Sequence, residues 1–197
     1  MTDNREIDWD EFQGFIKEFE DETDRAAVIL GAAKLDTLLY QLLGKFFLPS
    51  PAGRDELLDG DSPLSTFSAR INTAYRLGLI DAPFSRALHL IRRIRNSFAH
   101  ELSGCNLDSG AHRDRVKELV LPFKGLPFVK KFEEGFYSER KRSGPSAEFR
   151  TVLAIMTARL DFAVLWIRGV QNDQVLKLIE EGWEKEQTTP PQITEGE

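Results

Sequence analysis

The segment LHLIRRIRNSFAHEL, from Leu88 to Leu102, holds the residues whose types and spacing could do chemistry. On a helix with about 100° between successive residues, its apolar side chains form one stripe, and Arg95 falls inside that stripe. A second, polar face gathers His89, Asn96 and His100, with Arg92 and Arg93 on either side. Imidazole groups have a pKa of about 6.5 and transfer protons near neutral pH. The segment therefore predicts a helix with a cation on its core face and titratable groups on its polar face.

The place of Arg95 within an apolar stripe predicts a buried ion pair. An unpaired buried charge is very costly, so the guanidinium needs a carboxylate partner. Glu22 and Asp24 begin the most apolar stretch of the chain, and Asp24 lies on the same helical side as Val28 and Leu35. We therefore expect a structural ion pair between Asp24 and Arg95.

The order Arg95, Asn96, three residues and then His100, near the end of a helix, resembles the catalytic signature of HEPN domains. These domains are helical bundles, often dimeric, and many are metal-independent RNases. The resemblance implies that His100 acts as general acid or base and that Arg95 stabilises charge on the scissile phosphate. On an ideal helix the two side chains point about 140° apart, so joint action needs a distorted helix or a dimer cleft. Catalysis is therefore the alternative hypothesis, and the first expectation is a protein that is not an enzyme.

The elements that must position these residues are all predicted to be helices. Apolar residues recur at spacings of three and four, and no stretch shows a sustained alternation of period two. Asp21 or Thr23 is expected to cap the second helix, and Asp81 a later one. The expected helices cover about 8–20, 24–47, 64–77, 82–102, 111–121 and 146–170, with a shorter one reaching about 186. The fold class is therefore all-α, a single-domain bundle of about six to seven helices over residues 1–186.

Two segments do not fit this helical pattern. Residues 122–145 alternate Pro, Gly, Phe and Lys without a clear period, so we expect irregular structure there. Residues 187–197 are polar, include two prolines and are expected to be a disordered tail.

The charge of the chain is distributed unevenly. The net charge is −6, but residues 1–85 carry −8, residues 86–142 carry +6 and residues 143–197 carry −4. A basic middle segment can meet a phosphate backbone or an acidic protein, or it can pack against the acidic front of the same chain. If the middle segment binds nucleic acid or a partner protein, the expected contacts are Arg92, Arg93, Arg113, Arg115 and Lys117.

The rest of the composition limits the cellular location that we expect and the kinds of site that the chain can form. Cys105 is the one cysteine, so the chain forms no internal disulfide, in keeping with a reducing cytoplasm. A site built from several cysteines is excluded, and we expect no metal and no cofactor. The N-terminus lacks the apolar core of a signal peptide, and no apolar run approaches the roughly 20 residues of a membrane span. We therefore expect a cytoplasmic protein that does not bind a membrane.

Three separated blocks resemble the mannitol operon repressor family. They are ETDRAA at 22–27, PLSTFSARI at 63–71 followed by AY and LGLI, and LIRRIRNSFAH at 90–100. The resemblance covers about residues 15–120. It implies an all-helical regulator of mannitol uptake and use that forms a homodimer or a higher homo-oligomer.

The leading hypothesis is therefore a transcriptional regulator that acts by binding. The chain shows no clear recognition helix for DNA, and its net charge is negative. Repression can therefore be direct, by DNA binding, or indirect, through another regulatory protein or RNA. The alternatives are a HEPN-like RNase or RNA-binding module that uses Arg95 and His100, and a protein–protein adaptor that binds no nucleic acid.

Overall fold

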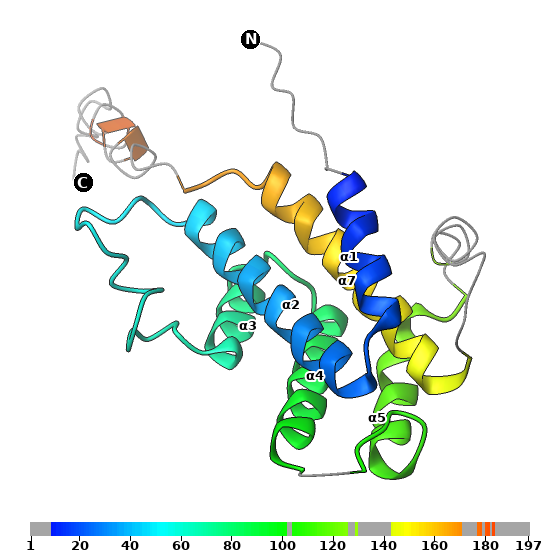
Figure 1. Ribbon diagram of the computed structural model, residues 1–197. Coiled ribbons are helices and arrows are strands. Elements are labelled where there is room, and N and C mark those ends of the chain that lie inside the picture. The colour runs from blue at the N-terminus through cyan, green and yellow to red at the C-terminus, as the bar shows by residue number, and fades with distance from the viewer. Residues whose placement is uncertain are drawn as a thin grey trace, which may run out of the picture.

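The structure, a computed structural model, describes residues 9–101, 104–125, 129 and 143–170, together with 177, 178, 180, 181 and 183. Within these residues the chain is helical and has no strand, so the all-α fold class is confirmed (Figure 1). The elements are α1 (Trp9–Asp21), α2 (Asp24–Phe46), α3 (Phe67–Arg76), α4 (Ala82–His100), α5 (Gly110–Val120), the short 3-10 helix η1 (Leu121–Phe123) and α7 (Gly144–Trp166).

The helix ends follow from local capping. Thr23 accepts a hydrogen bond from the Ala26 amide at 3.2 Å, and Asp81 accepts one from the Phe84 amide at 2.8 Å, so both helices begin at an expected cap. The main deviation is α3, which begins at Phe67 because Thr66 caps it, three residues later than predicted. Three predicted segments lie largely or wholly outside the described residues. They are most of the irregular segment, the helix predicted to reach about residue 186, of which five residues are described, and the predicted disordered tail.

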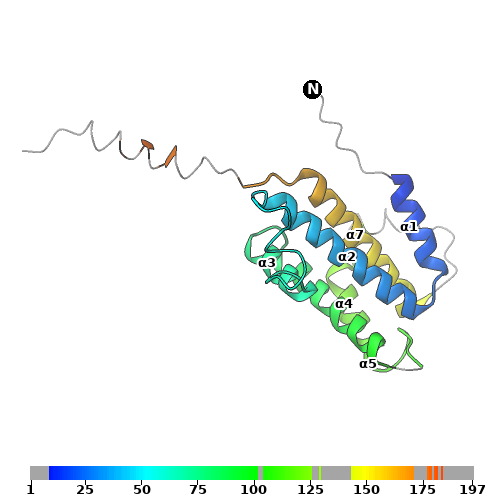
Figure 2. The ribbon, with the colours of Figure 1, turned by 60° about the vertical axis from the view of Figure 1, so that its left-hand side comes forward.

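Helices α2 and α7 lie side by side and run in the same direction (Figures 1 and 2). Near their C-terminal ends the Val170 amide donates to the Phe46 carbonyl at 2.8 Å, and Lys45 donates to the Val164 carbonyl at 3.2 Å. The approach is closest at Gly31, where an added Cβ would lie 2.0 Å from Leu153 Cδ2. A side chain at position 31 would therefore clash with Leu153 unless Leu153 or the helices shifted.

The other sides of α2 contact α1, α3 and α4, which makes α2 the central helix. Nine of its residues are buried, among them Val28, Leu35 and Leu42. Helix α5 packs between α4 and α7 and closes that end of the bundle (Figure 2). Packing against the core thus fixes the orientation of α4, and the opposite face of α4 is exposed to solvent.

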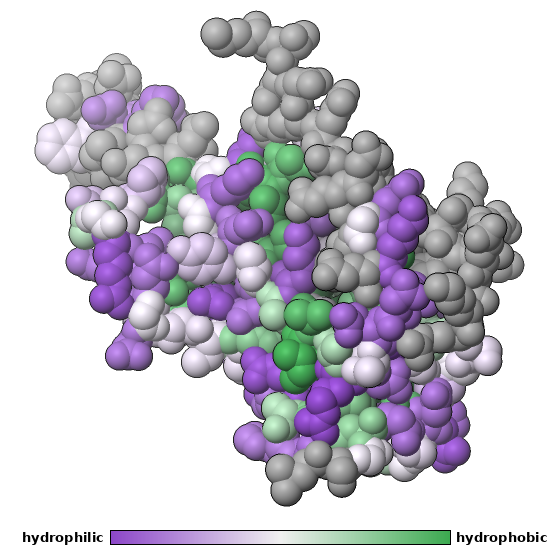
Figure 3. Space-filling model, viewed as in Figure 1, coloured by the Kyte–Doolittle hydropathy of each residue, from purple (hydrophilic) through white to green (hydrophobic). Residues whose placement is uncertain are grey.

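One expectation about membranes needs correction. By length and composition α2 is apolar enough to cross a membrane, whereas the sequence analysis expected no such segment. Half of its apolar window is buried inside the bundle, which is what the core helix of a globular protein shows. Some large apolar side chains are exposed, among them Leu30 on α2 and Phe162 and Trp166 on α7. On the face shown in Figure 3, hydrophobic surface is interspersed with hydrophilic residues.

Candidate interaction surface on helices α3, α4 and α5

Helix α4 has one buried face and one strongly basic face. Its buried face includes Phe84, Leu88, Ile91 and Phe98 and packs toward α2 and α3. The helix holds four arginines and no acidic residue, and none of the four is buried. We define the basic face as Arg76 on α3, Arg86, His89, Arg92 and Arg93 on α4, and Arg115 on α5.

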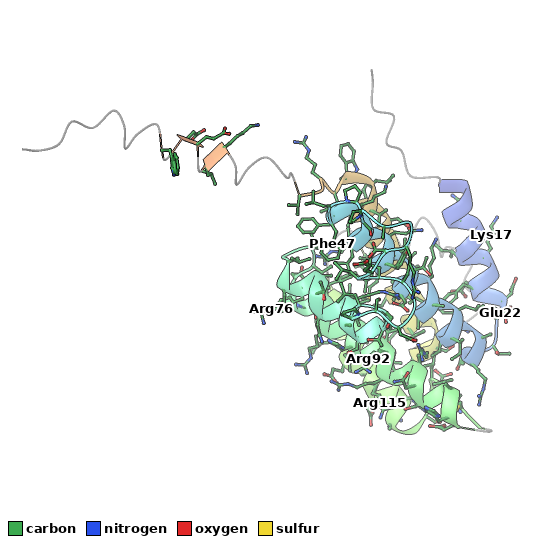
Figure 4. All side chains as sticks on the ribbon, turned by 90° about the vertical axis from the view of Figure 1, so that its left-hand side faces the viewer. Lys17, Glu22, Phe47, Arg76, Arg92 and Arg115 are labelled. Carbon is green, nitrogen blue, oxygen red and sulfur yellow. The ribbon has the colours of Figure 1, made fainter. Side chains whose placement is uncertain are left out.

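The basic face surrounds a hollow of about 490 Å³. Its walls come from three helices and are formed by Tyr75, Ala82, Ser85, Arg86, His89, Leu90, Arg93 and Glu118. Arg76, Arg92 and Arg115 lie on the side formed by α3, α4 and α5, away from Lys17 on α1 (Figure 4). The hollow therefore combines an aromatic wall with cationic rims, a composition suited to an acidic partner.

His89 is held as a neutral side chain in this surface. Its Nε2 lies 3.0 Å from Asn72 Oδ1 on α3. Partial burial lowers the pKa of His89, and the positive charges of Arg92 and Arg93 lower it further. These effects favour the neutral imidazole of His89, whereas an anion bound beside it would favour the protonated form.

The arginines of the basic face are only partly engaged. Arg86 forms an exposed ion pair with Glu118, and Arg115 donates to Ser97 Oγ at 3.0 Å. The Arg92 Nε is buried and has no hydrogen-bond partner among the described residues, while Arg93 is exposed. Charge on this face is therefore available for a partner.

The residues predicted for binding are only partly brought together. Arg93 lines the hollow, and Arg92 and Arg115 lie on the same side of the bundle. Arg113 is exposed on α5 and pairs with its neighbour Asp114 at 3.6 Å, and Lys117 is exposed on the same helix. Sequence reasoning missed Tyr75, Arg86 and Glu118, although the helical spacing of Arg86, His89 and Arg93 could have placed these three on one face.

The predicted ion pair between Asp24 and Arg95 is wrong. The Asp24 carboxylate instead accepts a hydrogen bond at 2.9 Å from Arg150 of α7, whose side chain is fully buried. Arg95 is only half-buried and donates to Asn96 Oδ1 at 3.1 Å. Arg95 lies on a partly exposed side of α4, so its charge needs no buried partner.

The alternative catalytic residues do not form a joint site within the described chain. Arg95 bonds to Asn96, whereas His100 is exposed at the C-terminal end of α4. No hydrogen bond joins Arg95 to His100 in the part of the chain that the structure describes. Their separation on the helix persists, and joint action would still require a second molecule.

Glu101, Cys105 and His112 form a polar cluster that the sequence analysis did not predict. The Cys105 thiol donates to Glu101 Oε2 at 2.8 Å, and His112 Nε2 lies 3.1 Å from Glu101 Oε1. The hydrogen bond to Glu101 raises the pKa of Cys105, and the same bond lowers the pKa of Glu101. The thiol is therefore not activated as a nucleophile.

Comparison with known proteins shows a likeness in fold. No protein-family model matches the chain, and no curated protein sequence does. The fold is similar to that of MtlR in the X-ray structure of the MtlR–HPr complex from Escherichia coli, with a TM-score of 0.56 and 18% sequence identity. The similarity covers 77% of this chain and 99% of that one. The chain thus has an MtlR-like helical fold.

Proposed function

We propose that this protein is a regulator of the mannitol operon type that acts by binding a partner protein rather than by catalysis. The observation that carries the proposal is the shared fold with MtlR, a mannitol operon regulator whose structure was solved in complex with HPr. The three sequence blocks that resemble the mannitol operon repressor family support the same conclusion. The protein would act as a homodimer or a higher homo-oligomer, which light scattering of the purified chain tests directly.

The basic face supports a protein partner of acidic surface charge. Tyr75 and Leu90 provide apolar contact in the hollow, and Arg86 and Arg93 provide positive charge at its rim. Aromatic residues and arginines are enriched in protein–protein interfaces. A dedicated nucleic-acid surface is usually more basic, and the whole chain carries a net charge of −6.

The test is titration of the purified protein with HPr in a calorimeter, at low and physiological salt. We expect saturable binding that weakens as salt rises, because exposed charges are screened. The charge reversal Arg93→Glu should weaken binding by at least about tenfold, or 1.4 kcal/mol. The matched control is Lys17→Glu, which makes the same charge change on α1, far from the basic face (Figure 4).

Other outcomes would replace the proposal. Equal binding by Arg93→Glu and the native chain would place the interface elsewhere. Absence of HPr binding, together with salt-resistant enrichment of discrete promoter fragments, would make the protein a direct DNA-binding repressor. Cleavage of single-stranded RNA in EDTA that His100→Ala abolishes would establish the HEPN-like RNase instead.

A further inference from the structure

Three side chains of metal-ligating type meet where α4 leads into α5. Glu101 is the C-terminal cap of α4, Cys105 lies in the connecting loop, and His112 lies in the first turn of α5. One ligand atom from each residue lies within 4.8 Å of the other two. We propose that this cluster binds one divalent metal ion of the zinc class, independently of the basic face.

The donor set decides the class of metal. Thiolate and imidazole ligands suit zinc and similar transition metals, whereas magnesium and calcium prefer oxygen ligands alone. Three protein ligands leave a fourth tetrahedral position for water or for a group from a partner. Glu101 is exposed and Cys105 is half-buried, so an ion can reach the cluster from solvent.

The cluster is held in place before any ion arrives. The His112 side chain is buried, and its ring packs on Phe98 with centroids 4.6 Å apart. Its Nδ1 has no partner among the described residues, so its hydrogen bond runs through Nε2 into the cluster. The loop that carries Cys105 is tied to α2, because the Leu107 amide donates to Asp24 Oδ2 at 2.9 Å. The ligands therefore lose little conformational freedom on binding.

Metal binding requires the three side chains to adjust their positions. Tetrahedral zinc with ligand bonds of about 2.0–2.3 Å separates its donor atoms by roughly 3.3–3.8 Å. Cys105 Sγ lies 2.8 Å from Glu101 Oε2, and His112 Nε2 lies 3.1 Å from Glu101 Oε1. Both distances must lengthen by a few tenths of an ångström or more, and the carboxylate must turn so that one of its oxygens faces the ion. On binding, the thiol proton of Cys105 leaves to solvent and a sulfur–metal bond forms. The oxidation states of sulfur and metal do not change.

Arg25 places a positive charge next to the cluster. Its guanidinium donates to the carbonyls of Phe98 and Glu101 and lies 3.7 Å from Cys105 Sγ. This positive charge repels a divalent cation, although it favours the thiolate that the cation needs.

The test is titration of the reduced, EDTA-treated protein with Co²⁺, followed by competition with Zn²⁺. We expect one equivalent of Co²⁺, a sulfur-to-cobalt charge-transfer absorption and its loss when Zn²⁺ is added. Zn²⁺ should also protect Cys105 from a thiol-modifying reagent. Failure to take up Co²⁺ or to protect the thiol would overturn the proposal.

Single substitutions test which side chains bind the metal. Cys105→Ser keeps a hydroxyl donor toward Glu101 and should abolish the charge-transfer absorption, with circular dichroism unchanged. Glu101→Gln and His112→Gln should weaken binding by at least about tenfold, the lower limit for disturbing even the surroundings of a metal site. The matched control is His100→Gln, an exposed histidine at the end of α4, which should bind as the native chain does. Native affinity in Cys105→Ser would refute the site.

Discussion

Arg150 and Arg93 are both arginines on long helices, and their surroundings are opposite. Arg150 is fully buried and bonds to Asp24 Oδ1 at 2.9 Å and to the Glu22 carbonyl at 2.9 Å, as well as to Phe19 and Ser146. Arg93 is exposed and lines a hollow of the basic face. The first cation has its hydrogen-bonding capacity used by α1, α2 and α7, whereas the second is exposed to solvent.

The difference assigns separate roles to the two halves of the bundle. Around Arg150 the polar groups satisfy one another, so the junction of α1, α2 and α7 fixes how these helices meet. On the basic face the ion pairs are exposed, and exposed pairs contribute about 0–1 kcal/mol to stability. Substitutions should therefore affect folding at Arg150 and binding at Arg93.

The largest effect is expected from Arg150→Met. The change removes one partner of a buried pair and leaves the Asp24 carboxylate without its cation, which should destabilise the fold by about 3–5 kcal/mol. Urea denaturation of the variant and of the native chain measures the difference. The matched control Arg93→Met should unfold at the native urea concentration. Equal loss of stability in both variants would contradict the contrast between the two regions.

The pair of Asp24 with Arg150 shows what the sequence could and could not supply. Asp24 does meet a buried arginine, but the prediction began from Arg95 and assigned Asp24 to it as the carboxylate that a buried cation needs. It selected Arg95, since that residue interrupts an apolar stripe. Helix α4 has a polar face to which Arg95 can turn, whereas α7 is apolar nearly all round, so a cation in its first turns must be buried. Comparing the whole circumference of both helices could have identified Arg150.

The candidate sites were less predictable than the helices. Periodicity and capping residues are local signals, and they located α1, α2, α4, α5 and α7 to within a few residues. The hollow depends on where α3 and α5 dock against α4, which no single segment encodes. Likewise, Glu101, Cys105 and His112 follow no metal-binding motif, and they meet because a loop tied to Asp24 folds back on α4.

The next effect in size concerns the α2–α7 contact. Gly31→Ala would put a methyl group 2.0 Å from Leu153 Cδ2, so the Leu153 side chain or the helices must shift, and we expect a loss of about 1–3 kcal/mol. Gly44→Ala makes the same change on the same helix, where the nearest atom is 3.6 Å away. That control should be neutral or slightly stabilising, because alanine is the better helix former. Thermal unfolding of Gly31→Ala and Gly44→Ala separates the effect of helix packing from that of helix propensity. If Gly44→Ala were destabilised as much as Gly31→Ala, the loss at Gly31 would not be due to packing against Leu153.

A smaller, pH-dependent effect belongs to Asp24. Burial alone raises its pKa, but hydrogen bonds from Ser146, Leu107 and Arg150 outweigh burial and lower the pKa below the ordinary 3.8. Because the folded pKa is the lower one, the contribution to stability is present above pH 3.8 and is lost as the pH falls through the folded value. Denaturation at a series of acidic pH values should show a steeper decline for the native chain than for Asp24→Asn. Parallel declines would mean that Asp24 titrates alike in the folded and unfolded states.

The smallest effect on stability is expected from Arg86→Gln, at the rim of the hollow. Arg86 and Glu118 are both exposed, so their ion pair is screened by water and salt, and its loss should change the free energy of unfolding by less than about 0.5 kcal/mol. The same variant should weaken the salt dependence of partner binding, because one positive charge no longer attracts the acidic surface. Urea denaturation and calorimetric titration of one preparation measure both quantities. If Arg86→Gln destabilised the fold as Arg150→Met does and left binding unchanged, α4 would use its arginines to hold α5, and the basic face would be structural.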